Sequence, residues 1–397
     1  MLTLRPAPGR LPVALAAVAL CLLALAVAAC GTEEDATTEL GPARFAELER
    51  AAEGTTVRWW MFGGDARINA YVDSEVVPAA ERLGIELERV PVADTAAAVQ
   101  RVLAQRRAGQ TDGGKVDLIW INGENFAAGK EAGLWLEDWV EGLPNADLVD
   151  LDDPSINEDL GVPVDGQEAP WSRAAFVYAT DSARVPDPPQ SFDELLAYAT
   201  DNPGRVTYPA PPDFTGTSFV KQAVIAMGED EAFAYLEELK PLMWEGGEKL
   251  PKSEAELNEL FANGEVDFAM SFNPSFVASA VEAGQFPSST RPFLLEGGAL
   301  VNTSYVTIPA DAANVAGAQV VANLLLSPRL QAIKADPRKL GIPTVLDRST
   351  LDSSQRRPFE SNPKSPYLLD DFGQTTEELP AAEVAPLEER WQREILR

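Results

Sequence analysis

The chain has 397 residues, a net charge of −30 at pH 7 and no histidine. The acidic excess excludes nucleic acid as a partner, because binding to a phosphate backbone requires a basic surface. The lack of histidine in the sequence excludes Ser-His-Asp and Cys-His nucleophilic catalysis and every imidazole metal ligand. We expect neither a cofactor nor a metal centre.

Residues 1–29 are typical of a secretory signal peptide, because Arg5 and Arg10 precede a continuous apolar run. The run ends in two alanines directly before Cys30, a pattern that resembles the bacterial lipobox. We therefore expect Cys30 to carry a lipid on the outer face of the cytoplasmic membrane, and residues 30–42 to form a tether. The alternative is an uncleaved transmembrane anchor, since about 20 apolar residues can span a bilayer. Either arrangement places the folded part outside the cytoplasm.

The mature chain has no disulfide to rely on, because Cys21 lies in the segment that cleavage removes and Cys30 becomes the anchor. Roughly 350 residues remain, which is more than one hydrophobic core usually holds. The sequence therefore predicts two lobes, each stabilised by burial of apolar side chains.

Strands and helices alternate through residues 43–171, the expected first lobe. In chain order the elements are helix 43–52, strand 56–62, helix 68–83, strand 85–92, helix 95–110, strand 115–121 and helix 125–134. Helices between successive strands are typical of a mainly parallel sheet covered on both faces.

An acidic, proline-punctuated region at 143–170 interrupts this alternation. The strand predicted at 172–180 then carries the chain into a second lobe, residues 172–298. Two capping boxes, Ser191–Glu194 and Ser253–Glu256, mark helix starts there. The lobe's other predicted elements are strand 205–209, helix 217–227 and helix 231–242.

The chain is expected to return to the first lobe through residues 299–345, which contain a predicted strand at 299–309 and a predicted helix at 313–335. Residues 346–397 would form an extension that packs on the lobes, with a terminal helix from Leu387.

Residues 116–126 and 266–276 repeat one pattern, in which a strand that begins Val-Asp is followed by a polar turn and a helix. The repetition supports two lobes of similar construction. The expected fold is therefore a two-lobed α/β structure with a mainly parallel sheet in each lobe and hinge strands between them.

Ligands of open parallel sheets bind where strands end and helices begin, because helix-start amides are exposed there. We expect ligand contacts at these turns from Gly63, Gly64, Asp65, Asn122, Glu124, Asn125, Asp213, Phe214, Thr215, Thr217, Ser271 and Asn273. Near the expected hinge we add Trp171 as an aromatic wall of the site, Arg173 beside it, and Tyr305 on the returning strand.

The chemistry of such a site is open between two classes of ligand. Asp65, Glu124 and Asp213 would together hold a cation, with aromatic rings adding cation–π attraction. Free amides and hydroxyls near Gly64 and Thr215 would instead hold an anion or a sugar. The acidic residues would equally serve as separate helix caps. No P-loop lysine is present in the second-lobe turn, so we do not expect a nucleotide.

Three blocks, residues 60–69, 116–126 and 208–222, together resemble YnjB-type ABC transporter solute-binding proteins. The resemblance extends over residues 57–343. It implies a type II periplasmic-binding-protein fold, whose lobes close on a small-molecule ligand and dock onto a permease served by a cytoplasmic ATPase. We accordingly expect a monomer that catalyses no reaction. The alternative function is a secreted, carboxylate-dependent glycosidase or lyase, with two acids about 5 to 9.5 Å apart across a cleft.

Overall fold

The computed structural model describes residues 42–92, 94–295, 299–369, 372 and 375–396. The expected signal peptide, the lipidated Cys30 and nearly all of the tether lie outside these residues. Within the described ranges, every helix is too short or too polar to cross a membrane.

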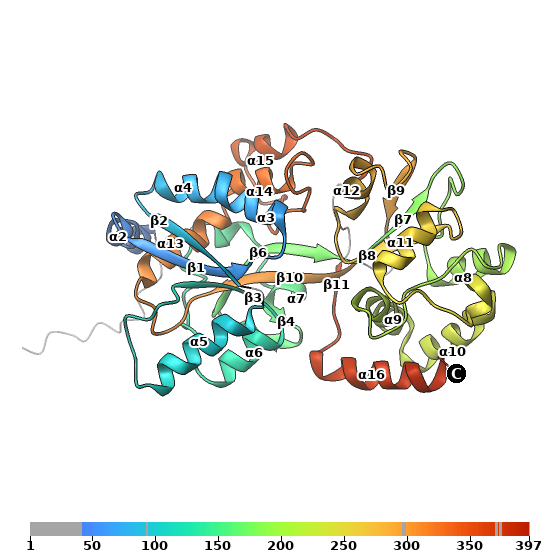
Figure 1. Ribbon diagram of the computed structural model, residues 1–397. Helices are drawn as coiled ribbons and strands as arrows, with labels where there is room; N and C mark the ends of the chain where they lie inside the picture. Colours follow the sequence, from blue (N-terminus) through green and yellow to red (C-terminus); the bar gives the residue numbers. More distant parts are fainter. Residues whose placement is uncertain (1–41, 93, 296–298, 370–371, 373–374, 397) are drawn as a thin grey trace, which may run out of the picture. The chain divides into compact units, whose positions relative to one another are not determined.

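A six-stranded sheet forms the centre of the first lobe (Figure 1). Its strands are β1 (Thr56–Phe62), β2 (Glu86–Val92), β3 (Leu118–Ile121), β6 (Glu168–Ala175), β10 (Ala299–Thr307) and β11 (Thr375–Glu377). The parallel pairing expected from the alternation is confirmed for β1 with β2 and with β3. Strand β10 makes the sheet mixed, because it runs antiparallel to β3 and β6 and parallel to β11.

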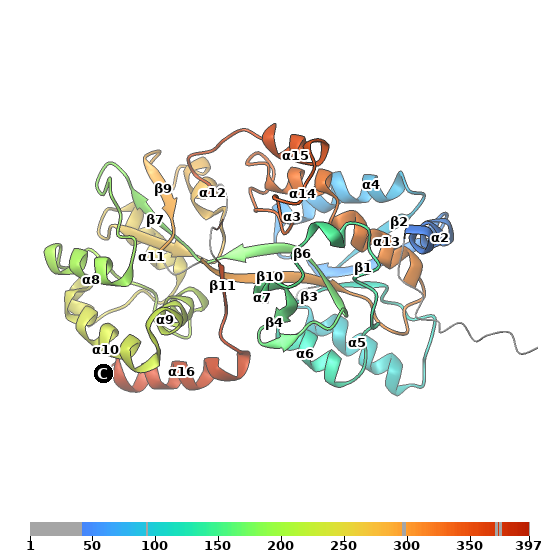
Figure 2. The same cartoon turned by 180° about the vertical axis from the view of Figure 1, so that it is seen from behind.

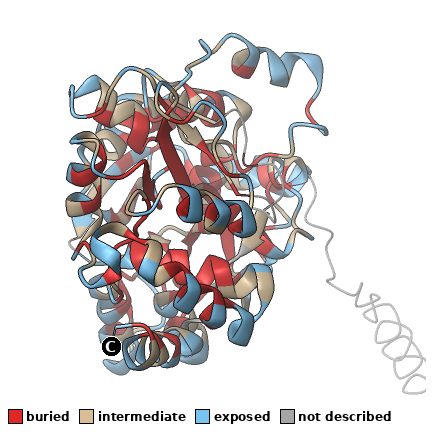
Figure 3. Ribbon diagram, turned by 90° about the vertical axis from the view of Figure 1, so that its right-hand side faces the viewer, coloured by how far each residue is buried: buried red, intermediate tan, exposed pale blue. Residues whose placement is uncertain are grey.

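Helices cover both faces of this sheet, as the alternation predicted. They are α2 (Pro42–Ala52), α3 (Ala66–Tyr71), a π-helical turn (Val72–Val76), α4 (Val77–Glu81), α5 (Ala96–Arg107), α6 (Glu124–Glu131), α13 (Val315–Leu325) and α14 (Pro328–Ala335). Val57, Trp59 and Met61 alternate along β1 and pack in the core that includes α2, α4 and α13. Ile119 and Ile121 of β3 belong to the other core, with α5 and α6. Figure 3 shows the buried residues on the strands and on the inner sides of the helices.

The second lobe contains a three-stranded sheet formed by β7 (Val177–Asp181), β8 (Phe268–Ser271) and β9 (Thr290–Phe293). Its helices are α8 (Phe192–Asp201), α9 (Phe214–Met227), α10 (Glu229–Leu239), α11 (Glu254–Ala262) and α12 (Phe276–Glu282). The expectation of a mainly parallel sheet is wrong here, because β7 is antiparallel to both of its neighbours. The strand expected at 205–209 joins no described ladder, although the carbonyl of Arg205 accepts a hydrogen bond from the Asp267 amide at 2.8 Å.

Shorter elements connect these parts of the chain. They are α7 (Pro154–Asn157), β4 (Glu158–Asp159), β5 (Val162–Pro163), α15 (Ser353–Glu360), α16 (Ala381–Glu394) and 3-10 turns at Ala146–Leu148, Lys240–Leu242 and Trp244–Gly247.

One expected helix, 313–335, is divided in the structure into α13 and α14. The Ser327 side chain caps the second helix by accepting a hydrogen bond from the Leu330 amide at 3.4 Å. Pro328 follows in the first turn, and a proline has no N–H with which to continue the preceding helix. The Ser-Pro pair therefore ends one helix and starts another.

Strands β6 and β10 each contribute to the cores of both lobes, and Figure 2 shows them side by side from behind. Trp171 of β6 lies in a first-lobe core, whereas Ala175 lies in the second-lobe core. On β10, Val301 lies in the second-lobe core and Val306 in a first-lobe core. The two strands thus connect the lobes through continuous backbone pairing.

The C-terminal segment contacts both lobes. Helix α15 packs on α14 of the first lobe. Helix α16, drawn in red in Figure 1, packs on the second-lobe core through Leu387, Trp391 and Ile395. Trp391 is fully buried, and its indole N–H donates a hydrogen bond to the Tyr208 hydroxyl at 3.0 Å. This extension is therefore an integral part of the folded chain.

Replacing Trp391 by alanine should lower the free energy of unfolding by about 3–5 kcal/mol, because a large buried aromatic side chain is deleted. Urea unfolding followed by circular dichroism measures the loss. The exposed neighbour Gln392 supplies the control, since Gln392→Ala should change stability by no more than about 0.5 kcal/mol. Equal stability of the two variants would show that α16 is not docked in solution.

Candidate functional site

A pocket of about 420 Å³ receives residues from both lobes. It is lined by Asn122, Gly123, Glu124, Asn125, Leu160, Ala174, Phe214, Phe272, Asn302, Ser304 and Glu378. A larger pocket of about 500 Å³ lies beside α14 and α15, but it contains none of the residues expected at the site. We therefore take the pocket shared by the lobes as the candidate ligand site.

The turn between β3 and α6 forms the first-lobe side of the pocket. Gly123 has a φ of 62°, and its amide donates a hydrogen bond to the Asp159 carboxylate at 2.5 Å. The Asn122 side chain donates to the Asn302 side chain at 2.8 Å. The turn favours glycine at position 123 because of this positive φ, which side chains rarely adopt. A Cβ there would also come within 2.9 Å of the end of the Leu160 side chain, which would have to move. The turn leaves Glu124 exposed at the pocket.

The start of α9 forms part of the second-lobe side. Asp213 caps this helix, because one carboxylate oxygen accepts from the Thr215 and Gly216 amides at 3.0 and 3.1 Å. The hydroxyls expected to face a ligand are already used, since Thr215 donates to Glu254 and Thr217 donates to Glu388, both at 2.6 Å. These two threonines line no described pocket; of the residues proposed at this turn, the 57% exposed Phe214 does.

The turn after β8 also departs from the expectation, because its polar side chains bond to neighbouring amides. Ser271 is buried, and its hydroxyl accepts from the Asn273 amide at 3.1 Å. The Asn273 side chain in turn accepts from the Ser275 amide at 2.9 Å. Phe272, between these two polar residues, lines the pocket instead and lies 5.3 Å from the Phe214 ring.

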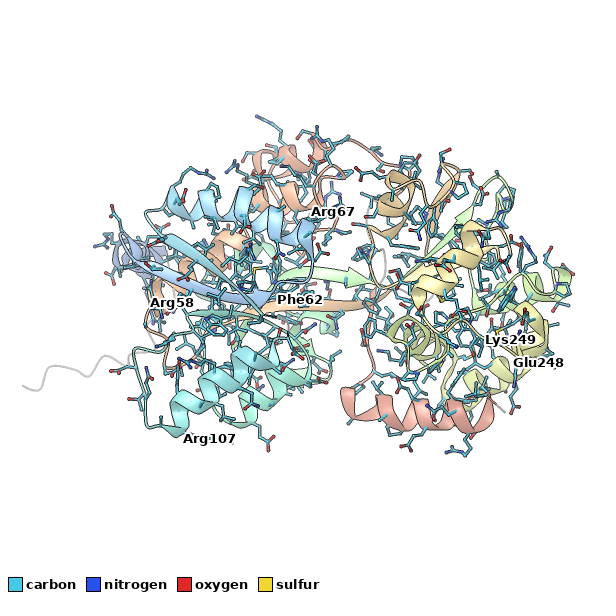
Figure 4. All side chains as sticks on the ribbon, in the orientation of Figure 1. Arg58, Phe62, Arg67, Arg107, Glu248 and Lys249 are labelled. Atoms are coloured by element: carbon cyan, nitrogen blue, oxygen red, sulfur yellow. The ribbon has the colours of Figure 1, made fainter. Side chains whose placement is uncertain are left out.

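The turn after β1 does not line this pocket either. The Gly63 amide donates to the Val92 carbonyl at 2.9 Å, and Asp65 caps α3 by accepting from the Arg67 and Ile68 amides. Arg67, labelled in Figure 4, donates to the Ser279 hydroxyl of α12 at 2.8 Å. Gly64 lies between Gly63 and Asp65 in this turn, and the hydrogen bond of Arg67 connects the lobes at α3 and α12.

The three residues expected near the hinge lie on the connecting strands β6 and β10, and each contacts other residues of the protein. They are Trp171, Arg173 and Tyr305. The expectation that Trp171 is an aromatic wall of the site needs correction, because its side chain is 1% exposed and packs edge-on against Trp59 and Trp120 in the first-lobe core. Arg173 forms an ion pair with Asp153 at 3.0 Å. The Tyr305 hydroxyl donates to main-chain carbonyls, the nearer at 3.0 Å.

Sequence reasoning missed the pocket residues on the connecting strands and in the C-terminal segment. Asn302 and Ser304 alternate along β10 with buried residues, so their period-2 pattern could have placed them on one open face. Ala174 is the pairing partner of Asn302 on β6. The sequence around Glu378 did not indicate a site residue, because only the folding of the C-terminal extension brings this side chain to the pocket.

Buried carboxyl groups lie beneath the first-lobe side of the pocket. Asp159 is 3% exposed, and burial, reinforced by Glu378 and opposed by the hydrogen bond from Gly123, raises its pKa to about 7. Glu168 is fully buried, and neither of its carboxyl oxygens has a hydrogen-bond partner among the described residues. Burial, with Asp159 nearby, raises the pKa of Glu168 well above its ordinary value.

Asp159→Asn should flatten the pH dependence of stability. A raised folded-state pKa stabilises the protein fully below the unfolded-state pKa, near 3.8, and this contribution is lost as the pH rises to about 7. The wild type should therefore lose up to about 4 kcal/mol more than the variant across this window. Urea unfolding at pH 4, 5.5 and 7.5 measures the difference. The exposed Asp152→Asn is the control, and a wild-type slope in Asp159→Asn would contradict the assignment.

Comparisons with known proteins place this arrangement in context. The family model described as "Bacterial extracellular solute-binding protein" matches residues 76–364. Protein YnjB of Escherichia coli (strain K12) is 38% identical over 363 residues, which cover 87% of this chain and 92% of that protein.

Two solved structures are similar in fold. A putative extracellular solute-binding protein from Bordetella parapertussis has a TM-score of 0.65 and 14% identity, covering 86% of this chain and 98% of that one. The spermidine/putrescine ABC transporter substrate-binding protein PotD from Streptococcus pneumoniae has a TM-score of 0.60 and 12% identity, covering 85% of this chain and 99% of that one.

Proposed function

Since the chain belongs to the family of bacterial extracellular solute-binding proteins, we propose that it captures a small solute in the pocket between its lobes and delivers it to the permease of an ABC importer. The observation that carries this proposal is the pocket itself, which takes residues from both lobes, from the two connecting strands and from the C-terminal segment. Capture by such a pocket needs no reacting group, and we propose that the protein catalyses no reaction.

Family membership confirms the resemblance to YnjB-type proteins, the solute-binding function and the location outside the cytoplasm. The likeness to solved structures confirms the two-lobed type II periplasmic-binding-protein fold. The alternative of a carboxylate-dependent glycosidase or lyase has no support from the comparisons.

The proposed mechanism is closure of the lobes on the solute. We assign residues 43–171 and 299–345 to the first lobe and 172–298 to the second, with 346–397 as an extension. Core membership along β6 agrees with a change of lobe near residue 172, because Trp171 packs in a first-lobe core and Ala175 in the second-lobe core. On β10 the change comes a few residues after 299, because Val301 still packs in the second-lobe core and Val306 in a first-lobe core. A hinge of this kind needs dihedral changes at only a few positions. Solute that contacts both lobes would favour the closed form.

The proposed partners follow from this mechanism. The lobes would dock on a permease served by a cytoplasmic ATPase, and a lipid on Cys30 would hold the protein at the membrane. We propose that the protein acts as a monomer.

The first test identifies the solute by native mass spectrometry of protein purified from its host, and then fills the pocket by Ala174→Trp. The variant should lose solute binding, because Ala174 lines the pocket opposite Asn302 and the larger indole would fill part of the pocket. Solute should also reduce the radius of gyration of the wild type in X-ray scattering, but not that of the variant. Ala108→Trp, at an exposed position after α5, is the matched control. Full binding by Ala174→Trp would place the solute elsewhere.

The second test concerns the anchor. In the native host, Cys30→Ser should abolish lipid labelling and release the protein from the membrane fraction, because the thiol that accepts the lipid is gone. Immunoblotting of membrane and soluble fractions measures the change. Continued membrane association with an uncleaved N-terminus would support the transmembrane anchor instead.

A further inference from the structure

We propose that Glu378, from the C-terminal segment, binds a protonated amine of the solute, so that the ligand is an organic cation with at least one N–H group. The inference rests on the proposed function and names the ligand class of the same pocket. Three independent features of the described residues carry it.

The first feature is how the backbone places Glu378. Strand β11 pairs in parallel with β10, with Glu377 opposite Val301. Glu378 directly follows the end of β11, Asn302 is the next residue on β10, and both line the pocket. Helix α16 then fixes the following backbone to the second lobe through Trp391. The carboxylate is therefore held at the pocket from both sides.

The second feature is a vacant acceptor on this carboxylate. One oxygen accepts a hydrogen bond from Lys221, and the two side chains are only 4% and 3% exposed. The other oxygen is buried and has no partner among the described residues. A buried acceptor that lacks a hydrogen bond destabilises the protein, and more so when it is charged. An N–H group of a bound solute would satisfy it.

The third feature is the charge of the lining. Glu124 and Glu378 line the main pocket, and a small adjoining pocket adds Glu158. Neither lining includes a lysine or arginine among the residues that the structure describes. On the second lobe, the buried Lys221 forms an ion pair with Glu378. The electrostatic field thus favours a cation over an anion.

Aromatic rings beside the carboxylate suit the same ligand. The Phe214 and Phe272 rings both line the pocket. The ammonium group of Lys221 already lies 5.5 Å from the centre of the Phe214 ring. More than half of the surface of Phe214 is exposed, so the ring has surface available for cation–π attraction to a second cation.

Isothermal titration with putrescine, spermidine and agmatine, and with fructose 6-phosphate and citrate as anionic probes, tests the assignment. At least one amine should bind the wild type, and Glu378→Gln should weaken it about ten- to a hundredfold through loss of a charged hydrogen bond. Because Glu378→Gln leaves Lys221 buried without its counter-charge, a Glu378→Gln/Lys221→Gln variant is measured alongside, with folding checked by circular dichroism. Glu383→Gln, an exposed glutamate in the first turn of α16, should bind like the wild type.

An amine that binds Glu378→Gln as tightly as the wild type would overturn the inference. Binding of the anions alone, or of none of the three amines, would overturn the ligand class. In each of these cases, the binding of the host-derived solute to the wild type and to Ala174→Trp still tests whether the pocket captures a solute. Failure of this inference is therefore distinct from failure of the proposed function.

Discussion

The antiparallel pairing of β6 with β10 is the constraint on which the rest of the structure depends. The ladder extends from Val301 opposite Ala175 to Thr307 opposite Glu168, across the change from one core to the other. It also forms one wall of the pocket, because Ala174 and Asn302 are partners in it. The same hydrogen bonds therefore connect the lobes and position the surface that a solute would contact.

An irregularity in this ladder has a local consequence. The register shifts between Ser304 and Tyr305, and such bulges change the direction in which neighbouring side chains point. Ser304 lines the pocket, whereas Tyr305 turns into a first-lobe core and donates to main-chain carbonyls. Two consecutive residues of β10 therefore point to different places, Ser304 to the pocket and Tyr305 to the core. The same strand thus contributes to both the ligand site and the core.

Helix-start residues of this chain are used mostly to complete the fold. Asp65 and Asp213 each accept two amide hydrogen bonds at a helix start, as capping aspartates do. Only Glu124, of the three acids expected at the site, lines the pocket. The negative lining comes in part from Glu378, which is distant in sequence from both lobes' strand-end turns. Tertiary packing of the extension therefore adds one of the acidic residues in the lining of the pocket.

The sequence alone determined the fold class, most helix and strand positions and the turn at residues 122–125, because hydrophobic periodicity and capping residues act over short distances. It also indicated two lobes, because the chain is longer than one hydrophobic core usually holds. Only the tertiary structure decided that β7 pairs antiparallel with its neighbours, that Trp171 turns into the core and that Glu378 reaches the pocket. These features depend on contacts between residues far apart in the chain, and such contacts leave no periodic pattern in the sequence around any one residue.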